Sequence, residues 1–294
     1  MRYLPVVLIT LIASSLLPVR AQPPVATLSE NAKRYFSIEQ HDMESTHRLP
    51  YRIFIAIPRD ITAQEKRPVL YVLDANAQFP LAVNSYTPAQ GPAPVIVGIG
   101  YRIDQGYDIP ARTRDYTPLA PTPDPDFGAG GEAEQFYQFI QNKVKPWVAA
   151  RVPVNPQQQT LAGHSFGGLF VLYTLFNHGE SFQRYLAASP SIWWGDGVVI
   201  PKRSPLLTSN PTSVTISVGE YEEKPPKADP NQPIDPKRAK RQAQRTMVTK
   251  ARDLAAQLHT ENASATFILF EGKHHGSVIP DAMSKAVEVA LAPQ

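Results

Sequence analysis

The chain has 294 residues, a formal net charge of +3, thirty prolines and no cysteine. Since a leader containing Arg2 and Arg20 is expected to be removed, the charge falls to +1, which argues against a nucleic-acid partner despite the high isoelectric point. Without cysteine, a thiol nucleophile, a thiolate metal site and a disulfide framework are all excluded.

The first residues have the pattern of a signal peptide. Met1-Arg2 is positive, the run from Leu4 to Leu17 is apolar, and Val19-Arg20-Ala21 is a cleavage site. We therefore expect residues 1–21 to be removed after Ala21, and the protein to reach the periplasm. The alternative is an uncleaved anchor, but the apolar run is shorter than the roughly 20 residues that span a bilayer.

The remaining residues, 22–294, are expected to form a single α/β domain. Strand patterns cover residues 34–40, 51–57, 69–73, 94–100, 158–162, 185–189, 213–218 and 265–270. Helical patterns cover residues 131–148, 167–178, 238–259 and 282–291. This alternation predicts an α/β fold with a doubly wound, mostly parallel sheet and an antiparallel N-terminal edge hairpin. Ligands of such sheets bind at the carboxyl ends of the strands.

One turn between a predicted strand and a predicted helix reads Gly163-His164-Ser165-Phe166-Gly167, a G-x-S-x-G nucleophile elbow. A turn this tight forces Ser165 into a strained conformation, which the pattern tolerates because small residues stand two positions before and after it. Its hydroxyl would stand at a helix N-terminus, where developing negative charge is favoured. The alternative is a glycine-rich turn with a solvated serine.

Two late loops follow strands in the order expected for an α/β-hydrolase, with an acid before a histidine. The loop 219–223 carries glutamates, and the loop 271–277 carries His274 and His275. One histidine would take the proton of Ser165 while a carboxylate orients its ring. From the residues alone the two histidines compete, and a histidine pair binding a metal is a weaker alternative because no third ligand is evident at close spacing.

A proline-rich and lysine-rich insertion around residues 223–240 does not fit the sheet pattern, and it is expected to end in a helix with a basic face. We hypothesise a lid that raises positive potential over the site through Lys237, Arg238, Lys240 and Arg241. A solvated insertion with an ordinary charged helix is the alternative.

Five runs of sequence, residues 73–76, 112–118, 162–168, 189–194 and 275–278, together resemble the putative esterase (esterase D-like) family of α/β-hydrolases. Within that family the similarity is greatest to periplasmic siderophore esterases of the IroE type. The resemblance implies a serine esterase that hydrolyses trilactone bonds of catecholate siderophores such as enterobactin, with no metal or organic cofactor.

The resemblance also implies roles for single residues. Ser165 would be the nucleophile and His275 the general base, and the oxyanion hole would be the backbone N–H groups of Phe166 and Asn76. The acid would be Glu222, with Glu220 as the fallback. The wider family more often has aspartate at this place, and some siderophore esterases are described as using a serine-histidine dyad, so the third member stays open.

A ferric catecholate is a trianion with aromatic rings, so its site should offer fixed positive charge and flat apolar surfaces. The candidate substrate-binding residues are Arg112 and Tyr116, on the loop after the fourth strand, and Trp193 and Trp194, after the sixth. One tryptophan is expected to pack in the core instead. Arg114 is a further candidate, with a salt bridge to Asp115 as its alternative.

Other functions remain open at this stage. A feruloyl or acyl-carbohydrate esterase, or an acyltransferase, would use the same catalytic residues on another substrate. A non-catalytic relative that binds ferric siderophore is a further alternative, although intact serine and histidine argue against it. The expected partners are a small-molecule ester and, transiently, an outer-membrane siderophore receptor.

Overall fold

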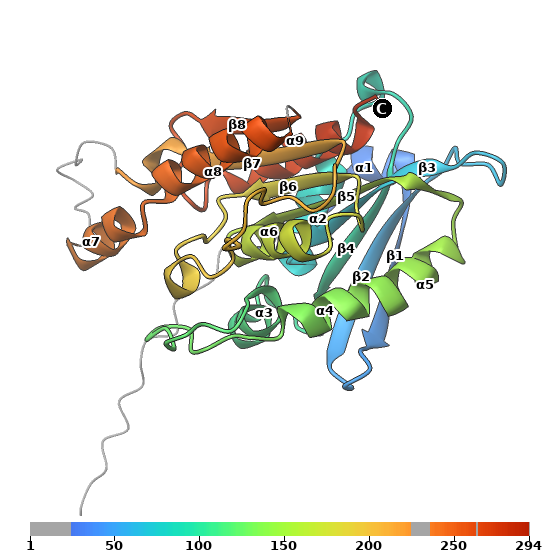
Figure 1. Ribbon diagram of the computed structural model, residues 1–294. Helices are drawn as coiled ribbons and strands as arrows, with labels where there is room; N and C mark the ends of the chain where they lie inside the picture. Colours follow the sequence, from blue (N-terminus) through green and yellow to red (C-terminus); the bar gives the residue numbers. More distant parts are fainter. Residues whose placement is uncertain (1–24, 225–235, 263, 294) are drawn as a thin grey trace, which may run out of the picture.

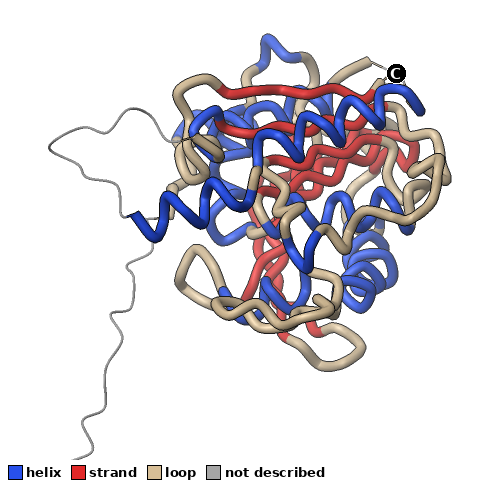
Figure 2. Tube along the Cα trace, turned by 60° about the vertical axis from the view of Figure 1, so that its left-hand side comes forward, coloured by secondary structure: helices blue, strands red, loops and turns tan. Residues whose placement is uncertain are grey.

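The structure, a computed structural model, describes residues 25–224, 236–262 and 264–293. The predicted signal peptide and the proline-rich part of the insertion lie outside the described residues. Figures 1 and 2 show one twisted sheet with helices on both of its faces. This arrangement confirms the predicted α/β fold class.

The sheet of the described residues has eight strands in the order β1-β2-β4-β3-β5-β6-β7-β8. β2 pairs in antiparallel fashion with β1 on one side and with β4 on the other, and the remaining neighbours are parallel. The predicted edge hairpin is thus present. The strands are β1 (Phe36–Glu44), β2 (Pro50–Pro58), β3 (Arg67–Leu73), β4 (Val95–Tyr101), β5 (Val154–His164), β6 (Arg184–Ala188), β7 (Ser213–Gly219) and β8 (Ala265–Phe270).

Helices cover the sheet on both faces because each strand of its centre is apolar along both sides. The α-helices are α1 (Glu30–Tyr35), α2 (Ala75–Ser85), α3 (Ile109–Tyr116), α4 (Ala133–Phe139), α5 (Lys145–Ala149), α6 (Phe166–Asn177), α7 (Pro236–Arg245), α8 (Met247–Glu261) and α9 (Ile279–Leu291). A π-helix, η2 (Ile140–Val144), joins α4 to α5, and the short 3-10 helices are η1 (Pro88–Gln90), η3 (Trp194–Asp196) and η4 (Glu220–Glu222). α2 and α9 pack together on one face, whereas α4, α6 and α8 pack on the other.

Three helical segments differ from the sequence patterns. The predicted helix 238–259 is two helices, because Thr246 between α7 and α8 adopts φ +46°. α2 was not predicted, since Pro80 lies inside it. The predicted loop carrying Arg112 is the helix α3, in which Asp108 caps the N-terminus and Pro110 occupies the first turn.

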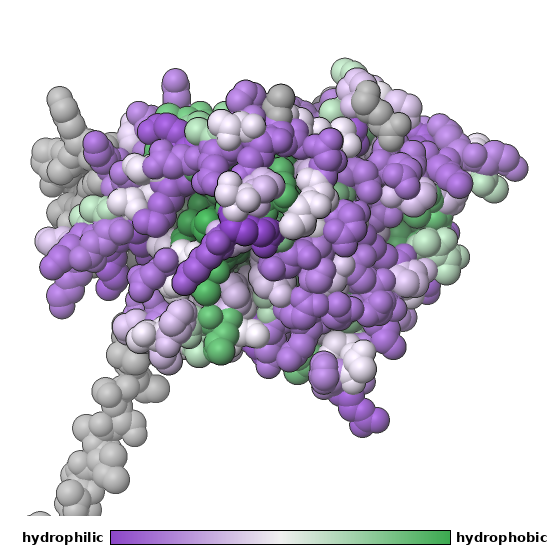
Figure 3. Space-filling model, viewed as in Figure 1, coloured by the Kyte–Doolittle hydropathy of each residue, from purple (hydrophilic) through white to green (hydrophobic). Residues whose placement is uncertain are grey.

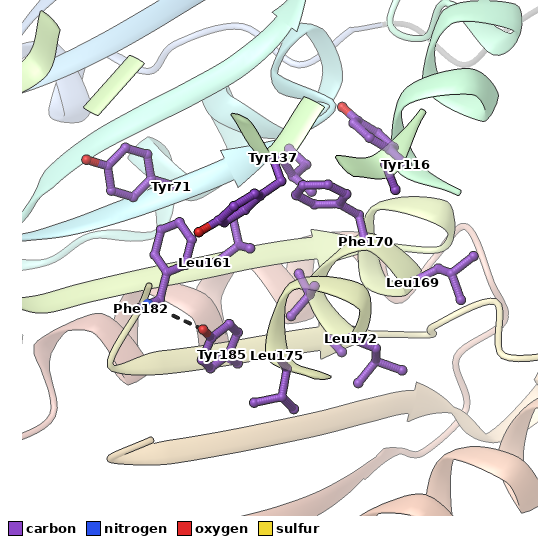
Figure 4. Close-up of a cluster of buried hydrophobic side chains, with 14 of the residues drawn as sticks. Tyr71, Tyr116, Tyr137, Leu161, Leu169, Phe170, Leu172, Leu175, Phe182 and Tyr185 are labelled. Atoms are coloured by element: carbon purple, nitrogen blue, oxygen red, sulfur yellow. Dashed lines mark hydrogen bonds between the residues drawn. The ribbon is translucent and has the colours of Figure 1, made fainter. Parts of the chain in front are cut away.

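The larger hydrophobic core lies between the sheet and α4, α6 and α8. Figure 4 shows Phe170 of α6 close to Tyr116 and Tyr137, while Tyr71, Leu161 and Tyr185 come from strands. Burying a side chain of this size contributes about 1.5–3 kcal/mol. Such packing fixes the carboxyl ends of β5, β7 and β8, from which the loops with Ser165, Glu222 and His275 start.

The surface seen in Figure 3 is mostly hydrophilic, with small hydrophobic patches between the charged side chains. Within the described ranges, no helix is both long and apolar enough to cross a membrane.

Candidate active site

Ser165 stands at the turn between β5 and α6 with φ 64° and ψ −118°, a strained conformation for a residue with a side chain. Its N–H donates to the carbonyl of Ala188 at 2.9 Å, which holds the turn in place. A Cβ on Gly163 would lie 2.5 Å from the Gly167 carbonyl oxygen, and one on Gly168 would lie 2.6 Å from that of Ala188. Gly167 itself has room for a Cβ, so the close approaches require glycine two residues before and three residues after the serine.

The structure brings three predicted residues into a continuous hydrogen-bonded relay. His275 Nε2 lies 3.0 Å from Ser165 Oγ, and His275 Nδ1 lies 2.5 Å from Glu222 Oε2. With Glu222 ionised, Nδ1–H donates to the carboxylate, which leaves Nε2 to accept the serine proton. A general base must be within such reach of the proton that it removes.

The carboxylate of Glu222 is buried and fully hydrogen-bonded. Its Oε1 accepts from the Ser189 hydroxyl at 2.5 Å and from the Gly219 N–H at 2.7 Å, while Oε2 faces His275. Burial alone would raise the pKa of Glu222, but these hydrogen bonds and the attraction of His275 in its protonated form outweigh it, so the pKa lies below its ordinary value. Glu222 is therefore ionised at neutral pH.

Glu220 and His274, the alternatives to Glu222 and His275, form hydrogen bonds with the backbone of the loop 271–277. Glu220 Oε2 accepts from the Gly272 N–H at 2.8 Å, which ties the acid loop to the histidine loop. His274 Nδ1 accepts the N–H groups of Gly276 and Ser277 at 3.2 and 3.3 Å. Neither side chain bonds Ser165, so the geometry selects Glu222 and His275 from the alternatives that the sequence left open.

His164 is a residue at the site for which the sequence analysis gave no role. It is 4% exposed, and its ring centroid lies 4.5 Å from that of His275. Burial and the positive charges of His275 and Arg112 hold the pKa of His164 well below its ordinary value, so its ring stays neutral behind the relay. Only the position before the serine could have signalled this contact.

A cavity of about 550 Å³ lies over Ser165, within the usual size range of small-molecule sites. Its floor includes Phe166, whose backbone N–H is the first of α6 and so has no acceptor within the helix. The cavity is lined by positive and aromatic side chains: Arg112, Phe127, Phe166, Trp193, Arg241 and Arg245.

Asn76, whose backbone N–H is the predicted second oxyanion donor, lies in the first turn of α2. α2 begins directly after Asp74, whose φ of 50° turns the chain so that Asn76 lies over β4. Its side-chain amide bonds the Tyr101 and Ile103 carbonyls, and it lines a different cavity of about 240 Å³. Asn76 is not among the residues that line the cavity over Ser165. The position of its side chain does not test its backbone N–H, so the assignment of this N–H to the oxyanion hole stays a prediction.

Arg112 and Tyr116, both predicted to bind substrate, differ in exposure. Arg112 lines the cavity, but its Nε and Nη2 donate to the buried carboxylate of Asp74 at 2.9 Å each. Tyr116 is fully buried and its hydroxyl accepts the Asp74 N–H at 3.0 Å, so a contact with substrate does not fit its position. Both side chains hold Asp74 in its left-handed conformation.

The tryptophan pair divides as the sequence suggested. Trp193 lines the cavity, whereas Trp194 is fully buried and donates from Nε1 to the Pro118 carbonyl at 2.8 Å. Trp194 therefore packs in the core and is not a substrate contact. Arg114 forms the salt bridge with Asp115, at 2.7 Å, that was the alternative for it.

A strained serine on an elbow, a histidine and a buried carboxylate at the carboxyl ends of β5, β7 and β8 define an α/β-hydrolase of the serine hydrolase class. Residues 45–277 match the family described as Putative esterase. The chain belongs to this family and is an ester hydrolase.

Individual relatives give a finer comparison. The ferri-bacillibactin esterase BesA of Bacillus subtilis is 32% identical over 83% of this chain and 85% of that protein. The siderophore triacetylfusarinine C esterase of Aspergillus fumigatus is 33% identical over 85% of this chain and 91% of that protein. The crystal structure of the BES protein from Bacillus cereus superimposes with a TM-score of 0.72 at 28% identity, covering 92% and 99% of the two chains. The predicted resemblance to siderophore esterases is confirmed.

Proposed function

We propose that this protein hydrolyses the ester bonds of siderophores, and that its substrates are catecholate trilactones such as enterobactin. The hydrogen-bonded relay of Ser165, His275 and Glu222 beneath a cavity with arginine and aromatic walls carries the proposal. The names of the relatives support the siderophore class, and the chemistry of the cavity favours an anionic, aromatic substrate within that class.

The reaction would proceed by acyl transfer in two steps. Ser165 Oγ attacks the ester carbonyl as His275 Nε2 takes its proton, and the proton then passes to the leaving alkoxide oxygen. Glu222 stabilises the imidazolium in between. A water molecule then attacks the acyl-enzyme as His275 Nε2 takes its proton. His275 gives this proton to Ser165 Oγ as the bond to the acyl group breaks, which releases the carboxylic acid and restores the serine.

The oxyanion of the tetrahedral intermediate needs donors beside Ser165. We assign the backbone N–H of Phe166 to this role, at the N-terminus of α6. The guanidinium of Arg112 borders the same cavity, and Nη1 is its one nitrogen that is not bonded to Asp74. It is a further candidate for the second donor, beside the backbone N–H of Asn76.

The test is product analysis by chromatography after incubation with enterobactin, with and without iron, for the wild type and Ser165→Ala. We expect linear dihydroxybenzoylserine products from the wild type alone, because Ser165→Ala should lower kcat by about 10⁴-fold or more. Ferri-bacillibactin and triacetylfusarinine C belong in the same panel. Cleavage of feruloyl or simple aryl esters with every siderophore untouched would refute the substrate and retain the mechanism.

We further propose a periplasmic location after cleavage behind Ala21, with transient contact to an outer-membrane siderophore receptor. The support is the sequence pattern of residues 1–21. Cell fractionation with N-terminal sequencing of the mature protein tests the location, since a mature chain that begins at Gln22 in the periplasmic fraction is the expected result.

A further inference from the structure

A second cavity adjoins the one over Ser165. It measures about 510 Å³, and its walls come from the proline-rich loop 121–126, from Trp193 and from the final turns of α7. The two cavities share Asp126, Trp193, Arg241 and Arg245 as lining residues. Figures 1 and 2 show that α7 projects at the margin of the molecule, away from the helices that cover the sheet.

The boundary between the two cavities is a stacked pair. The Arg245 guanidinium carbon lies 3.8 Å from the centroid of the Trp193 ring, and both side chains line both cavities. Phe127 lines the cavity over Ser165, and its ring centroid lies 6.4 Å from that of Trp193. A ligand that crossed this boundary would therefore touch an aromatic face and a cation together.

The positive charges at this boundary are not compensated by salt bridges. Within the ranges that the structure describes, neither Arg241 nor Arg245 forms an ion pair with a carboxylate. Three carboxylates, those of Asp124, Asp126 and Asp196, also line the second cavity. Asp124 accepts the N–H groups of Asp126 and Phe127 and so stabilises its own turn. Burial and the charge of Arg241 lower the pKa of Arg245 against the opposing effects of Asp124 and Asp126. Because the Arg245 guanidinium stacks on Trp193 with no ion pair in the part of the chain that the structure describes, its charge is available to an anionic ligand at this boundary.

We infer that the second cavity is a subsite for another arm of the same substrate molecule, and that the stacked Trp193 and Arg245, with Arg241, bind that arm as an anionic aromatic group. One ester sits over Ser165 while a second arm crosses the boundary. This inference rests on the proposed function, because it requires a substrate with several anionic arms. Of the basic residues of α7, it assigns Arg241 and Arg245 to substrate recognition.

The experiment compares kcat/KM for three probes. Ferric enterobactin is anionic with several arms, the mono-para-nitrophenyl ester of glutaric acid is anionic with one arm, and para-nitrophenyl butyrate is neutral with one arm. The test variants are Arg241→Gln/Arg245→Gln, which removes the charge, and Gln244→Trp, which narrows the second cavity alone. The matched control is Lys237→Gln/Lys240→Gln, an equal change of charge on α7 at residues that line neither cavity.

For Arg241→Gln/Arg245→Gln we expect the ratio of kcat/KM for ferric enterobactin to that for the neutral ester to fall about tenfold, mostly through KM. Added salt should lower this ratio in the wild type and much less in the variant. Gln244→Trp should lower the ratio for ferric enterobactin and leave the ratio between the two one-armed esters unchanged.

An equal fall of this ratio in Lys237→Gln/Lys240→Gln would overturn the inference. The effect would then come from the positive charge of α7 as a whole and not from the second cavity. Equal ratios for the wild type and both test variants would also overturn it. If the wild type cleaves no siderophore, the proposed function fails separately. The two para-nitrophenyl esters then still test whether Arg241 and Arg245 select for negative charge.

Discussion

Two regions of the cavity over Ser165 differ in whether their charged groups form ion pairs. We call the region with Ser165, Glu222, His275 and Arg112 the floor, and the region with Trp193, Arg241 and Arg245 the outer wall. On the floor, Glu222 is paired with His275 and Arg112 with Asp74, and both carboxylates are almost completely buried. On the outer wall, Arg241 and Arg245 extend from α7 without an ion pair among the described residues. Arginine occurs in both regions, yet the charges of the two regions are available to a ligand to different degrees.

This difference indicates a division of labour. Charges that are paired away from water have fixed positions, which suits groups that must be in place before the reaction starts. Charges that lack a partner keep their attraction for a ligand, and they suit recognition. The relevant feature of an arginine in this cavity is therefore its partner, and each prediction below removes one group from one of the two regions.

The largest effect is expected for Glu222→Gln on the floor. An amide cannot stabilise the imidazolium of His275, so kcat should fall by about 10³–10⁴-fold while KM changes little. Steady-state kinetics on para-nitrophenyl butyrate measures both constants. Glu220→Gln is the control and should keep kcat within about threefold, because its carboxylate bonds Gly272 and not His275. A loss of no more than threefold in Glu222→Gln as well would show that the site works as a dyad, and equal large losses in both variants would contradict a specific role for Glu222.

Arg112→Met is expected to affect stability most strongly. It leaves the carboxylate of Asp74 buried without its cation, which costs about 3–5 kcal/mol of unfolding free energy. Urea denaturation measures this cost, and adding Asp74→Asn to the variant should recover part of it. Arg52→Met is the matched control, since the pair of Arg52 with Asp42 is more exposed and is worth at most about 1 kcal/mol. Equal costs for the two arginines would contradict the comparison.

The fold and the catalytic residues follow closely from the sequence, because they depend on local patterns. The strand before Ser165, the glycines around it and the two late loops are each written in consecutive residues. Chain order alone does not choose His275 over His274 or Glu222 over Glu220. That choice depends on bonds such as Gly272 to Glu220, which join residues 52 positions apart.

The contacts of the arginines could not be predicted from local sequence patterns. Arg112 lines the cavity, as its predicted role requires, but its salt bridge to Asp74, 38 residues earlier at the end of β3, could not be read from the sequence. Tyr116 was expected to contact substrate, but it is fully buried and its hydroxyl accepts the N–H of Asp74, 42 residues earlier in the chain. Conversely, α7 was expected to carry basic residues, but its contact with Trp193 is set by the break at Thr246.

The pairing on the floor also predicts a pH dependence of stability. The pKa of Glu222 is lower in the folded state than its ordinary value of 4.5, so the carboxylate stabilises the fold fully above 4.5. As the pH falls below that value, the unfolded chain takes up the proton first, and the contribution is lost as the pH passes through the folded pKa. Urea denaturation between about pH 3 and 6 should show this loss in the wild type and not in Glu222→Gln. Parallel curves for both proteins would contradict it.

The smallest effect tests the outer wall. Trp193→Ala removes the aromatic face beneath Arg245, and a contact of this kind is worth about 1 kcal/mol when partly exposed. We expect KM for ferric enterobactin to rise about three- to tenfold, with kcat nearly constant, since the relay is not touched. Trp147→Ala is the matched control, because Arg151 stacks on Trp147 at 3.9 Å outside the lining of the cavity. A loss of kcat in Trp193→Ala, or an equal rise of KM in Trp147→Ala, would mean that floor and wall do not act separately.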